Sequence, residues 1–336
     1  MSSLDPIPRP LPSGASRRWR DVALLGGLFI LVLAGLIGLA AATGWQETMA
    51  QLSKLGGGQF VVLLALSLLN YAFRGLRWHI FSRKLGLATG FVQNLRHYLG
   101  GFAMSVTPGR VGELVRMRWL SRETGWAFER TAPLVLADRA SDLAAMGIIL
   151  ALTIAFSTTG IGGALPVAAL ALVAAFVATR PRLLVWVAGA GYRIVGRWPR
   201  IFARVRTAAR SLSRFSSPWV LGLAAFVGAL GWFAEGYAFH LLLVWLGADI
   251  GLAKAVAIFI FATLAGGLTG APGGVGGAEA AMVALLVLEG VPMEVSVPAT
   301  AIIRVTTLWF AIAIGLVVFP IAERYSMKGK DALEEN

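Results

Sequence analysis

The 336-residue sequence contains no cysteine and only three histidines, His79, His97 and His240. The absence of cysteine excludes disulfides and thiolate chemistry, and three histidines so far apart do not form a metal-binding cluster. The phosphate-binding motif GxxxxGK followed by Ser or Thr is also missing, so we expect no ATP hydrolysis by this chain. We therefore predict a protein without catalytic residues, metal or cofactor.

Charged residues are also scarce, at 14% of the chain against 57% hydrophobic residues. A soluble domain cannot hide so much apolar surface in one core, so this composition is typical of a membrane protein. The formal net charge is +13, with ten Lys or Arg in 74–130, nine in 180–214, and only Lys254 between 215 and 303. The positive-inside rule explains this distribution without a nucleic-acid partner, and it favours contact with anionic lipid.

Crossing a hydrocarbon core of roughly 30 Å takes about 20 apolar residues. Six segments meet this requirement, namely 22–43, 58–76, 132–158, 161–179, 218–246 and 296–320. The basic residues predict a plasma-membrane domain over 21–325 between two cytoplasmic tails, 1–20 and 326–336. No small-residue cleavage site follows the first apolar run, so we expect the first span to remain in the mature protein.

Two further apolar segments, 91–107 and 252–289, do not fit a simple crossing. The first leads into the Pro/Gly phrase SVTPGRVGELVR, and the second contains GAPGGVGGAEAA. Irregular backbone at membrane depth needs protein or a watery cavity around it. We expect re-entrant helical hairpins, the first dipping in from the cytoplasm and the second from outside. The predicted breaks are Pro108, Gly109, Gly112, Pro272, Gly273, Gly274 and Gly276. Close packing of helices is an alternative reason for the glycines.

The segment 197–215 places Ile201, Val205 and Leu212 on one helical face and five arginines elsewhere around the helix. This pattern indicates an amphipathic helix lying on the cytoplasmic leaflet. A solvated basic loop that follows the positive-inside rule fits the same residues.

The two Pro/Gly phrases belong to a larger internal similarity. The matched pairs are Pro108 with Pro272, Asn70 with Glu235, Glu113 with Glu279 and Arg139 with Arg304, at offsets of 164, 165, 166 and 165 residues. Because the hairpins are expected to enter from opposite sides, the halves 22–158 and 161–320 would form an inverted-topology repeat, with the substrate site near the midplane. Coincidence among glycine-rich membrane segments is the alternative. The predicted fold is an all-α polytopic membrane protein.

Ionisable side chains inside membrane spans cost about 2.5–3.5 kcal/mol each on insertion scales, so their presence suggests function. The candidate headgroup-binding residues are Arg110, Glu113, Arg116, Asp138, Arg139, Asp142, Glu235, Glu279 and Arg304. Arg139 and Arg304 suit bidentate contact with phosphate, and the helix N-termini after each Pro-Gly attract anions. Buried ion pairs that lock helices together are the alternative, with Arg139 or Arg304 pairing with an acid across the cavity.

PGRVGELVR, DRASD, PGGVGGAEAAMVALLVLEGVP and the downstream Arg304 resemble the flippase-like integral-membrane family that includes the transmembrane half of lysylphosphatidylglycerol synthase. The resemblance covers about 20–325. It implies a polytopic plasma-membrane protein with re-entrant hairpins that moves lipids or lipid-linked molecules between leaflets. The acid of the second hairpin comes two residues later than that of the first, which loosens the one-to-one match. The soluble aminoacyltransferase domain of the synthases does not follow the last expected span, so we expect no lysyl-lipid synthesis.

The leading prediction is a translocase for membrane phospholipids, most naturally anionic ones, and not an enzyme. In this scheme Glu235 or Glu279 could carry a coupled proton. One alternative is a secondary transporter of a small soluble anion. Others are an enzyme on lipid phosphates using Asp138, Asp142 and Glu113, and a non-catalytic membrane partner of an envelope-lipid enzyme. The expected partners are lipid and, beyond it, a second copy of the chain or such an enzyme.

Overall fold

The structure is a computed structural model that describes residues 45–105, 107, 111–155, 164–195, 217–269 and 271–334. These residues are helical or lie in short connections, and no strand occurs among them. The expected span 22–43, both ends of the chain and the amphipathic segment 197–215 lie outside the described residues. So do Pro108, Gly109 and Arg110. The all-helical fold predicted from the sequence is confirmed for the described part of the chain.

The helices in chain order are α2 (Trp45–Leu52), α3 (Gly57–Leu85), α4 (Phe91–Gly100), the 3-10 turn η1 (Gly101–Met104), α5 (Val111–Thr124), α6 (Phe128–Ala155), α7 (Ala164–Thr179), α8 (Pro181–Val195), α10 (Pro218–Trp245), α11 (Leu252–Leu268), the 3-10 turn η3 (Pro272–Gly274), α12 (Gly277–Leu288), α13 (Met293–Arg304), the π-helical turn η4 (Val305–Trp309) and α14 (Phe310–Glu334). We call α4–η1–α5 the first hairpin and α11–η3–α12 the second hairpin.

Among the described residues, three helical stretches are long and apolar enough to cross a membrane: α3, α10 and the continuous run Met293–Gly329. They coincide with three of the expected spans. Helix α3 continues nine residues beyond the expected end at 76, so Arg77 lies within the helix rather than in a loop. Helix α6 has 28 residues but carries charges in its middle, and α7 has only 16 residues. The total of six spans therefore stays a prediction.

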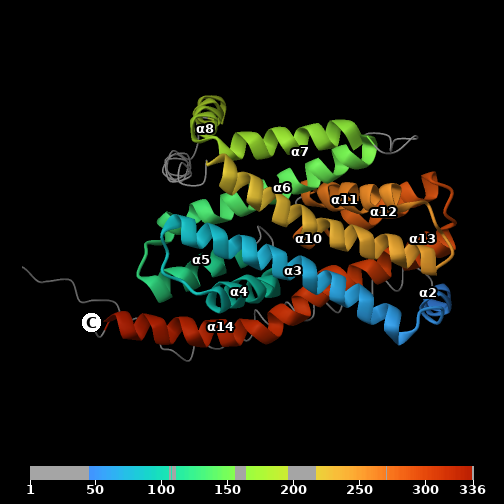
Figure 1. The fold of residues 1–336 in the computed structure, drawn as a ribbon, viewed down its shortest axis with the longest axis horizontal. Helices are drawn as coiled ribbons and strands as arrows, with labels where there is room; N and C mark the ends of the chain where they lie inside the picture. Colours follow the sequence, from blue (N-terminus) through green and yellow to red (C-terminus); the bar gives the residue numbers. More distant parts are fainter. Residues whose placement is uncertain are drawn as a thin grey trace, which may run out of the picture.

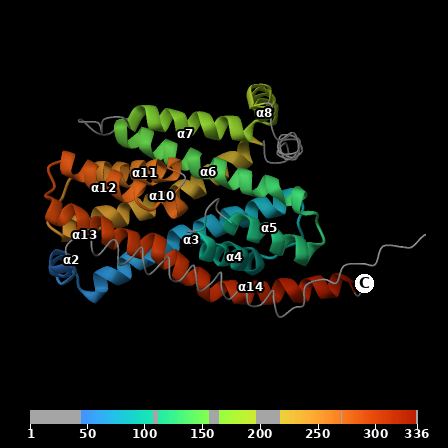
Figure 2. The ribbon, with the colours of Figure 1, turned by 180° about the vertical axis from the view of Figure 1, so that it is seen from behind.

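The long helices run along the long axis of the molecule, some toward one end and some toward the other (Figure 1). Helix α3 runs toward the end at which the chain terminates, α6 and α10 run away from it, and α14 returns to it (Figure 1). The first hairpin lies toward this same end, whereas the second hairpin lies toward the opposite end; the view from behind in Figure 2 shows the same placement. Helices α3 and α10 pack along each other, as do α6 and α7.

The ends of α3 and α10 are built alike. Helix α3 closes with Gly86 at φ 95° and a hydrogen bond from the Leu87 N–H to the Ser82 carbonyl. Helix α10 closes with Gly247 at φ 81° and a bond from the Ala248 N–H to the Leu243 carbonyl. The cap residues of α10 lie 161 residues after the corresponding cap residues of α3. The same offset separates the first residues of α3 and α10, and those of α4 and α11. Positive φ at both caps favours glycine, which has no Cβ to clash.

This offset corrects the alignment expected from sequence by one helical turn. With 161 in place of 165, Glu235 corresponds to Arg74 rather than to Asn70, and Asn70 corresponds to Gly231. Asn70 and Gly231 lie against each other, because a Cβ on Gly231 would be 3.4 Å from the Asn70 carbonyl oxygen. The helices α3 and α10 therefore touch at equivalent positions.

Four apolar clusters form among the described residues, and the two largest make up most of the core. One joins α6, α7, α10, α11 and α12 around residues such as Phe239, Ile258 and Met282. The other joins α3, α4 and α6 around Trp78 and Tyr98. Residues from the edges of both clusters line the cavity described next.

Candidate functional site

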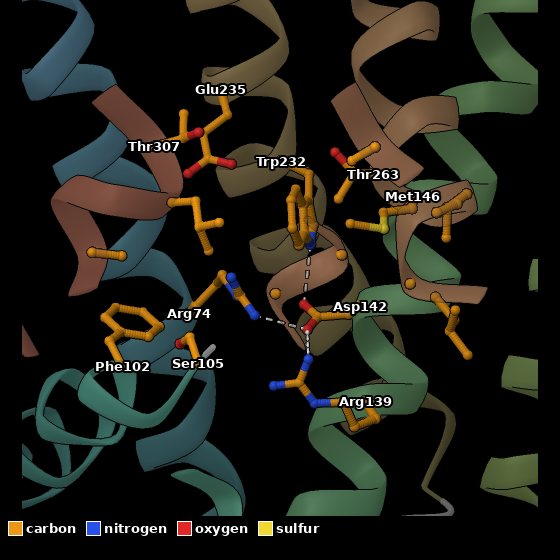
Figure 3. A pocket seen from close by; sticks show the side chains of 18 of the residues that line it. Arg74, Phe102, Ser105, Arg139, Asp142, Met146, Trp232, Glu235, Thr263 and Thr307 are labelled. Atoms are coloured by element: carbon orange, nitrogen blue, oxygen red, sulfur yellow. Dashed lines mark hydrogen bonds and ion pairs between the residues drawn. The ribbon is translucent and has the colours of Figure 1, made fainter. Parts of the chain in front are cut away.

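A cavity of about 560 Å³ lies where the two hairpins approach the long helices. Its walls come from η1 and α5 of the first hairpin, from α11, η3 and α12 of the second, and from α3, α6, α7, α10 and the α13–η4–α14 run. Figure 3 shows Asp142 near its centre, with Arg74 and Arg139 turned toward it and Glu235 and Thr307 at another wall. The volume lies within the range of about 300–1,000 Å³ found for small-molecule sites.

The structure gathers most of the predicted headgroup residues at this cavity. Six of them line it, namely Glu113, Arg116, Arg139, Asp142, Glu235 and Arg304. Asp138 and Glu279 lie behind the wall, where each bonds an arginine. Among the predicted breaks, Gly112, Gly273 and Gly274 line the cavity, and Pro272 and Gly276 belong to the turn of the second hairpin. Arg110, Pro108 and Gly109 lie outside the described residues.

Asp142 is the centre of a network of arginines. Its Oδ2 accepts a hydrogen bond from Arg74 Nη2 at 2.9 Å and lies 3.3 Å from Arg139 Nη1. Its Oδ1 accepts bonds from Arg77 Nη2 at 2.7 Å and from Trp232 Nε1 at 3.0 Å. With four donors around one carboxylate, Asp142 holds the arginines of α3 and α6 in place.

Asp138 completes this network one turn earlier on α6. Its Oδ1 accepts two hydrogen bonds from Arg77, at 2.9 Å from Nε and 2.6 Å from Nη2, and both side chains are fully buried. A buried carboxylate is tolerated when its charge is paired and hydrogen-bonded in this way. Within the described residues no group of three acidic or histidine side chains is arranged to hold a metal ion.

Each hairpin carries one acid that pairs with an arginine on the helix that follows. In the first half Glu113 Oε1 lies 2.7 Å from Arg139 Nε, and in the second half Glu279 Oε1 accepts a hydrogen bond from Arg304 Nε at 2.5 Å. Sequence offset alone matches Glu113 with Glu279 and Arg139 with Arg304. The structure shows one ion pair of the same kind beside each hairpin.

The turn of the second hairpin is held by the same arginine. Gly273 and Gly274 have φ of 64° and 67°, and Arg304 Nη2 donates to the Gly273 carbonyl at 3.0 Å. The N–H of Gly276 donates to Glu279 Oε2 at 2.7 Å, so a carboxylate of the chain itself caps the start of α12. The glycines here also allow close packing, since a Cβ on Gly274 would lie 3.0 Å from the Gly266 carbonyl carbon. Both sequence interpretations of the glycines therefore apply at this turn.

Sequence reasoning missed Arg74 and Arg77, which it assigned to the cytoplasmic end of a span. Arg77 is fully buried, and Arg74 lines the cavity 4.9 Å from the Trp232 ring. Tyr71 was also missed; its hydroxyl donates to the Thr307 carbonyl at 2.5 Å, within the π-helical turn η4. Such turns are often found at functional sites. A usable signal was present, because Tyr71, Arg74 and Arg77 are spaced by three residues and share one face of a helix.

A polar cluster outside the cavity fixes the first hairpin to α14. Glu323 accepts hydrogen bonds from Arg118 at 2.9 Å, from the Trp119 indole at 2.7 Å and from Arg122 at 2.6 Å. The two arms of each hairpin are also joined near their open ends, by Gln93 with Glu123 in the first and by Lys254 with Glu289 in the second. These contacts hold the hairpins as units beside the cavity.

A family model described as the lysylphosphatidylglycerol synthase transmembrane region matches residues 23–315, which include every residue that lines the cavity. A UPF0104 membrane protein of Methanothermobacter thermautotrophicus (strain Delta H) is 27% identical over 320 residues, covering 87% of this chain and 94% of that protein. A second UPF0104 membrane protein of the same organism is 31% identical over 108 residues, covering 32% of this chain and 31% of that protein. Neither relative's name states an activity.

Proposed function

The chain belongs to the lysylphosphatidylglycerol synthase transmembrane-region family of membrane proteins, and we propose that it is a translocase that moves lipid headgroups between leaflets. The observation that carries this proposal is the shared cavity. Residues of both hairpins and of the helices between them line one space that contains buried charges. A headgroup needs such a polar space to pass the hydrocarbon core, because an unpaired polar group in an apolar medium costs several kcal/mol.

We further infer that the halves form an inverted-topology repeat. The support comes from the hairpins at opposite ends of the long axis, from the matched glycine caps and from the matched pairs Glu113–Arg139 and Glu279–Arg304. In transporters with such repeats, the substrate site lies where the repeats meet, and one repeat moves against the other to expose it to either side. The contact between α3 and α10 at Asn70 and Gly231 would lie on the axis that relates the halves.

The proposed orientation follows the basic residues. The end of the molecule that holds the first hairpin and the C-terminal end of α14 carries Arg96, Arg118 and Arg122. The positive-inside rule puts this end in the cytoplasm, so the second hairpin would face the outside of the plasma membrane. The first hairpin would then dip in from the cytoplasm, as the sequence predicts.

The cavity size supports a headgroup rather than a whole lipid as its occupant. A space of about 560 Å³ holds a small polar molecule. The acyl chains would stay in the bilayer, where the exposed apolar side chains of α7, such as Leu165, Val173 and Phe176, would also lie. Lipid translocation then needs only the polar part to cross the protein.

A secondary transporter of a small soluble anion remains the second candidate, because the same cavity and charges would suit it. The enzyme alternative loses support, since Asp138 and Asp142 both accept hydrogen bonds from arginines and Glu113 is paired with Arg139. A role as a membrane partner of an envelope-lipid enzyme would leave the buried charges of the cavity without a use.

The test is lipid exchange in vesicles that contain the purified chain. Fluorescently labelled phosphatidylglycerol, phosphatidylethanolamine and phosphatidylcholine are placed in both leaflets, and dithionite reduces the label in the outer leaflet only. The protein should increase the bleached fraction beyond the outer-leaflet share, with or without an imposed pH gradient. A bleached fraction equal to that of protein-free vesicles for every headgroup would refute the proposal, and uptake of radiolabelled phosphate by the same vesicles would favour the soluble-anion transporter.

A further inference from the structure

Arg116 differs from the other cavity arginines in what surrounds its charge. It lies on α5, lines the cavity and is only 3% exposed. Two of its donor nitrogens, Nε and Nη1, are buried without a hydrogen-bond partner among the described residues. A buried guanidinium with unused donors is costly, because removing the charge from water is compensated only by good pairing.

Aromatic rings form the immediate environment of this guanidinium. Its carbon lies 4.1 Å from the centroid of Tyr98, 5.6 Å from that of Phe102 and 5.7 Å from that of Trp78. Cation–π contacts attract a guanidinium to the faces of aromatic rings. They hold the cation in place but supply neither a hydrogen-bond acceptor nor a negative charge. The aromatic residues therefore fix the position of Arg116 and leave its charge open to an anion.

The remaining cavity arginines are already paired. Arg74 bonds Asp142, Arg139 lies against Glu113 and Asp142, and Arg304 bonds Glu279. Among the residues that the structure describes, no carboxylate lies within ion-pair distance of Arg116. A negatively charged ligand would therefore not need to break an existing ion pair to reach this guanidinium.

The second hairpin has no counterpart of this group. At the offset of 166 that relates Glu113 to Glu279, Arg116 corresponds to Met282, which is fully buried on α12. Space for Arg116 is provided by Gly101, since a Cβ there would lie 2.2 Å from Arg116 Nε. The charge available to a ligand thus lies on the side of the first hairpin only.

We propose that Arg116 is the binding residue for the phosphate group of the transported molecule, and that this subsite lies beside the first hairpin. The inference deepens the proposed function and rests on it for the lipid nature of the ligand. The shared chemistry is a phosphate anion, carried by a lipid headgroup or free in solution. Guanidinium binds phosphate oxygens through charge-assisted hydrogen bonds, which are stronger than neutral ones.

The experiment measures binding to the purified full chain in uncharged detergent by isothermal titration calorimetry. The probes are dihexanoyl-phosphatidylglycerol, inorganic phosphate and, as a zwitterionic comparison, dihexanoyl-phosphatidylcholine. Arg116→Met introduces the residue of the second half, and Arg116→Gln keeps polarity without charge. The matched control is Arg118→Met on the same helix, whose side chain is 43% exposed and pairs with Glu323. Gel filtration and thermal melting establish that each variant is folded.

Loss of one charge-assisted contact should weaken phosphatidylglycerol binding about ten- to a hundredfold in Arg116→Met. Arg116→Gln should lose affinity by a similar factor, and it serves as the test if Arg116→Met does not fold. The affinity of the Arg118→Met control should stay within about twofold of the unmodified chain. Binding of inorganic phosphate with the same dependence on Arg116, but no binding of the lipid, would keep the subsite and assign it to a soluble anion. The inference would be overturned by unchanged affinity in both Arg116 variants. It would also be overturned if the unmodified chain bound neither phosphatidylglycerol nor inorganic phosphate.

Vesicle exchange separates this inference from the proposed function. If Arg116→Met exchanges labelled phosphatidylglycerol at the rate of the unmodified chain, the subsite is wrong and the translocase proposal stands. If the unmodified chain exchanges no lipid but binds phosphate through Arg116, the translocase proposal is wrong and the subsite stands.

Discussion

The matched ion pairs predict that the pair of the second half is energetically more coupled than the pair of the first. Glu279 and Arg304 have side chains 14% and 8% exposed with 2.5 Å between the bonded atoms, whereas Glu113 and Arg139 are 18% and 29% exposed. Arg304 has no other carboxylate within ion-pair distance among the described residues, but Arg139 also reaches Asp142 at 3.3 Å. Removing Glu113 therefore leaves Arg139 paired, and removing Glu279 leaves Arg304 unpaired.

The perturbation is a double-mutant cycle in each half, with Glu279→Gln, Arg304→Met and their combination in one, and Glu113→Gln, Arg139→Met and their combination in the other. Breaking one partner of a buried pair costs about 3–5 kcal/mol. We expect Glu279→Gln to approach this value, and also to weaken the cap on Gly276. For Glu113→Gln we expect about 1 kcal/mol, as for partly exposed pairs.

The assay is reversible unfolding of the purified chain in mixed micelles, followed by tryptophan fluorescence or circular dichroism. The coupling free energy should be about 2 kcal/mol or more for Glu279 with Arg304, and smaller for Glu113 with Arg139. Equal coupling in both halves, or a larger value for the first pair, would refute the reasoning from burial and alternative partners.

Three further predictions concern stability, each measured as a shift in the melting temperature in detergent. Gly112→Ala should lower the free energy of unfolding by about 1–3 kcal/mol, because its Cβ would lie 2.3 Å from the Gly101 carbonyl oxygen. The control Gly57→Ala, whose Cβ would have nothing within 4 Å, should leave stability unchanged, and equal shifts in the two variants would contradict the prediction. Tyr71→Phe should cost about 1 kcal/mol through its lost bond to the carbonyl in η4, so an unchanged melting temperature would count against that bond. Glu323→Gln should cost about 1–2 kcal/mol, and much of this loss should vanish at high salt, which screens exposed charges.

The sequence predicted the helices wherever apolar runs determine them. Helices α3, α10 and the α13–α14 run coincide with expected spans because about 20 apolar residues suffice for a crossing. Helix α3 ends nine residues beyond the predicted end at 76, because the arginines from Arg74 onward predict the cytoplasmic end of the span. The burial of Arg74 and Arg77 depends on Asp138 and Asp142, which lie about 65 residues away in the sequence, and no local pattern reveals such a partner.

The internal similarity could also be predicted better near the two breaks than in the helices before them. Similar phrases around the two breaks match Glu113 with Glu279 and Arg139 with Arg304. In the structure, Glu113 pairs with Arg139 and Glu279 pairs with Arg304. An offset of 165 matches α3 with α10 one helical turn away from the alignment that their end caps and first residues give, which is 161. The two offsets differ because the segments between these helices and the breaks differ in length.

The residue types of the candidate site could be predicted from the sequence, but their roles stayed open. Arg116, Arg139 and Arg304 were all headgroup-binding candidates, and pairing of Arg139 or Arg304 with an acid was the alternative. The structure separates them, because Arg139 and Arg304 have carboxylate partners, whereas Arg116 lies against aromatic rings with no carboxylate within ion-pair distance among the described residues. Which arginine keeps a partner depends on side-chain directions across several helices, and these follow from packing rather than from spacing along the chain.

The contact of Asn70 with Gly231 has a mechanical consequence. Without a side chain at Gly231, α10 lies directly on the backbone of α3. If the two halves rotate against each other as proposed, this crossing would act as the fulcrum. In a rotation of one half about a fulcrum, atoms at the crossing stay nearly still and distant atoms sweep the longest arcs. A larger side chain at position 231 would separate α3 from α10 and change how far both ends of the molecule move, even though Gly231 does not line the cavity.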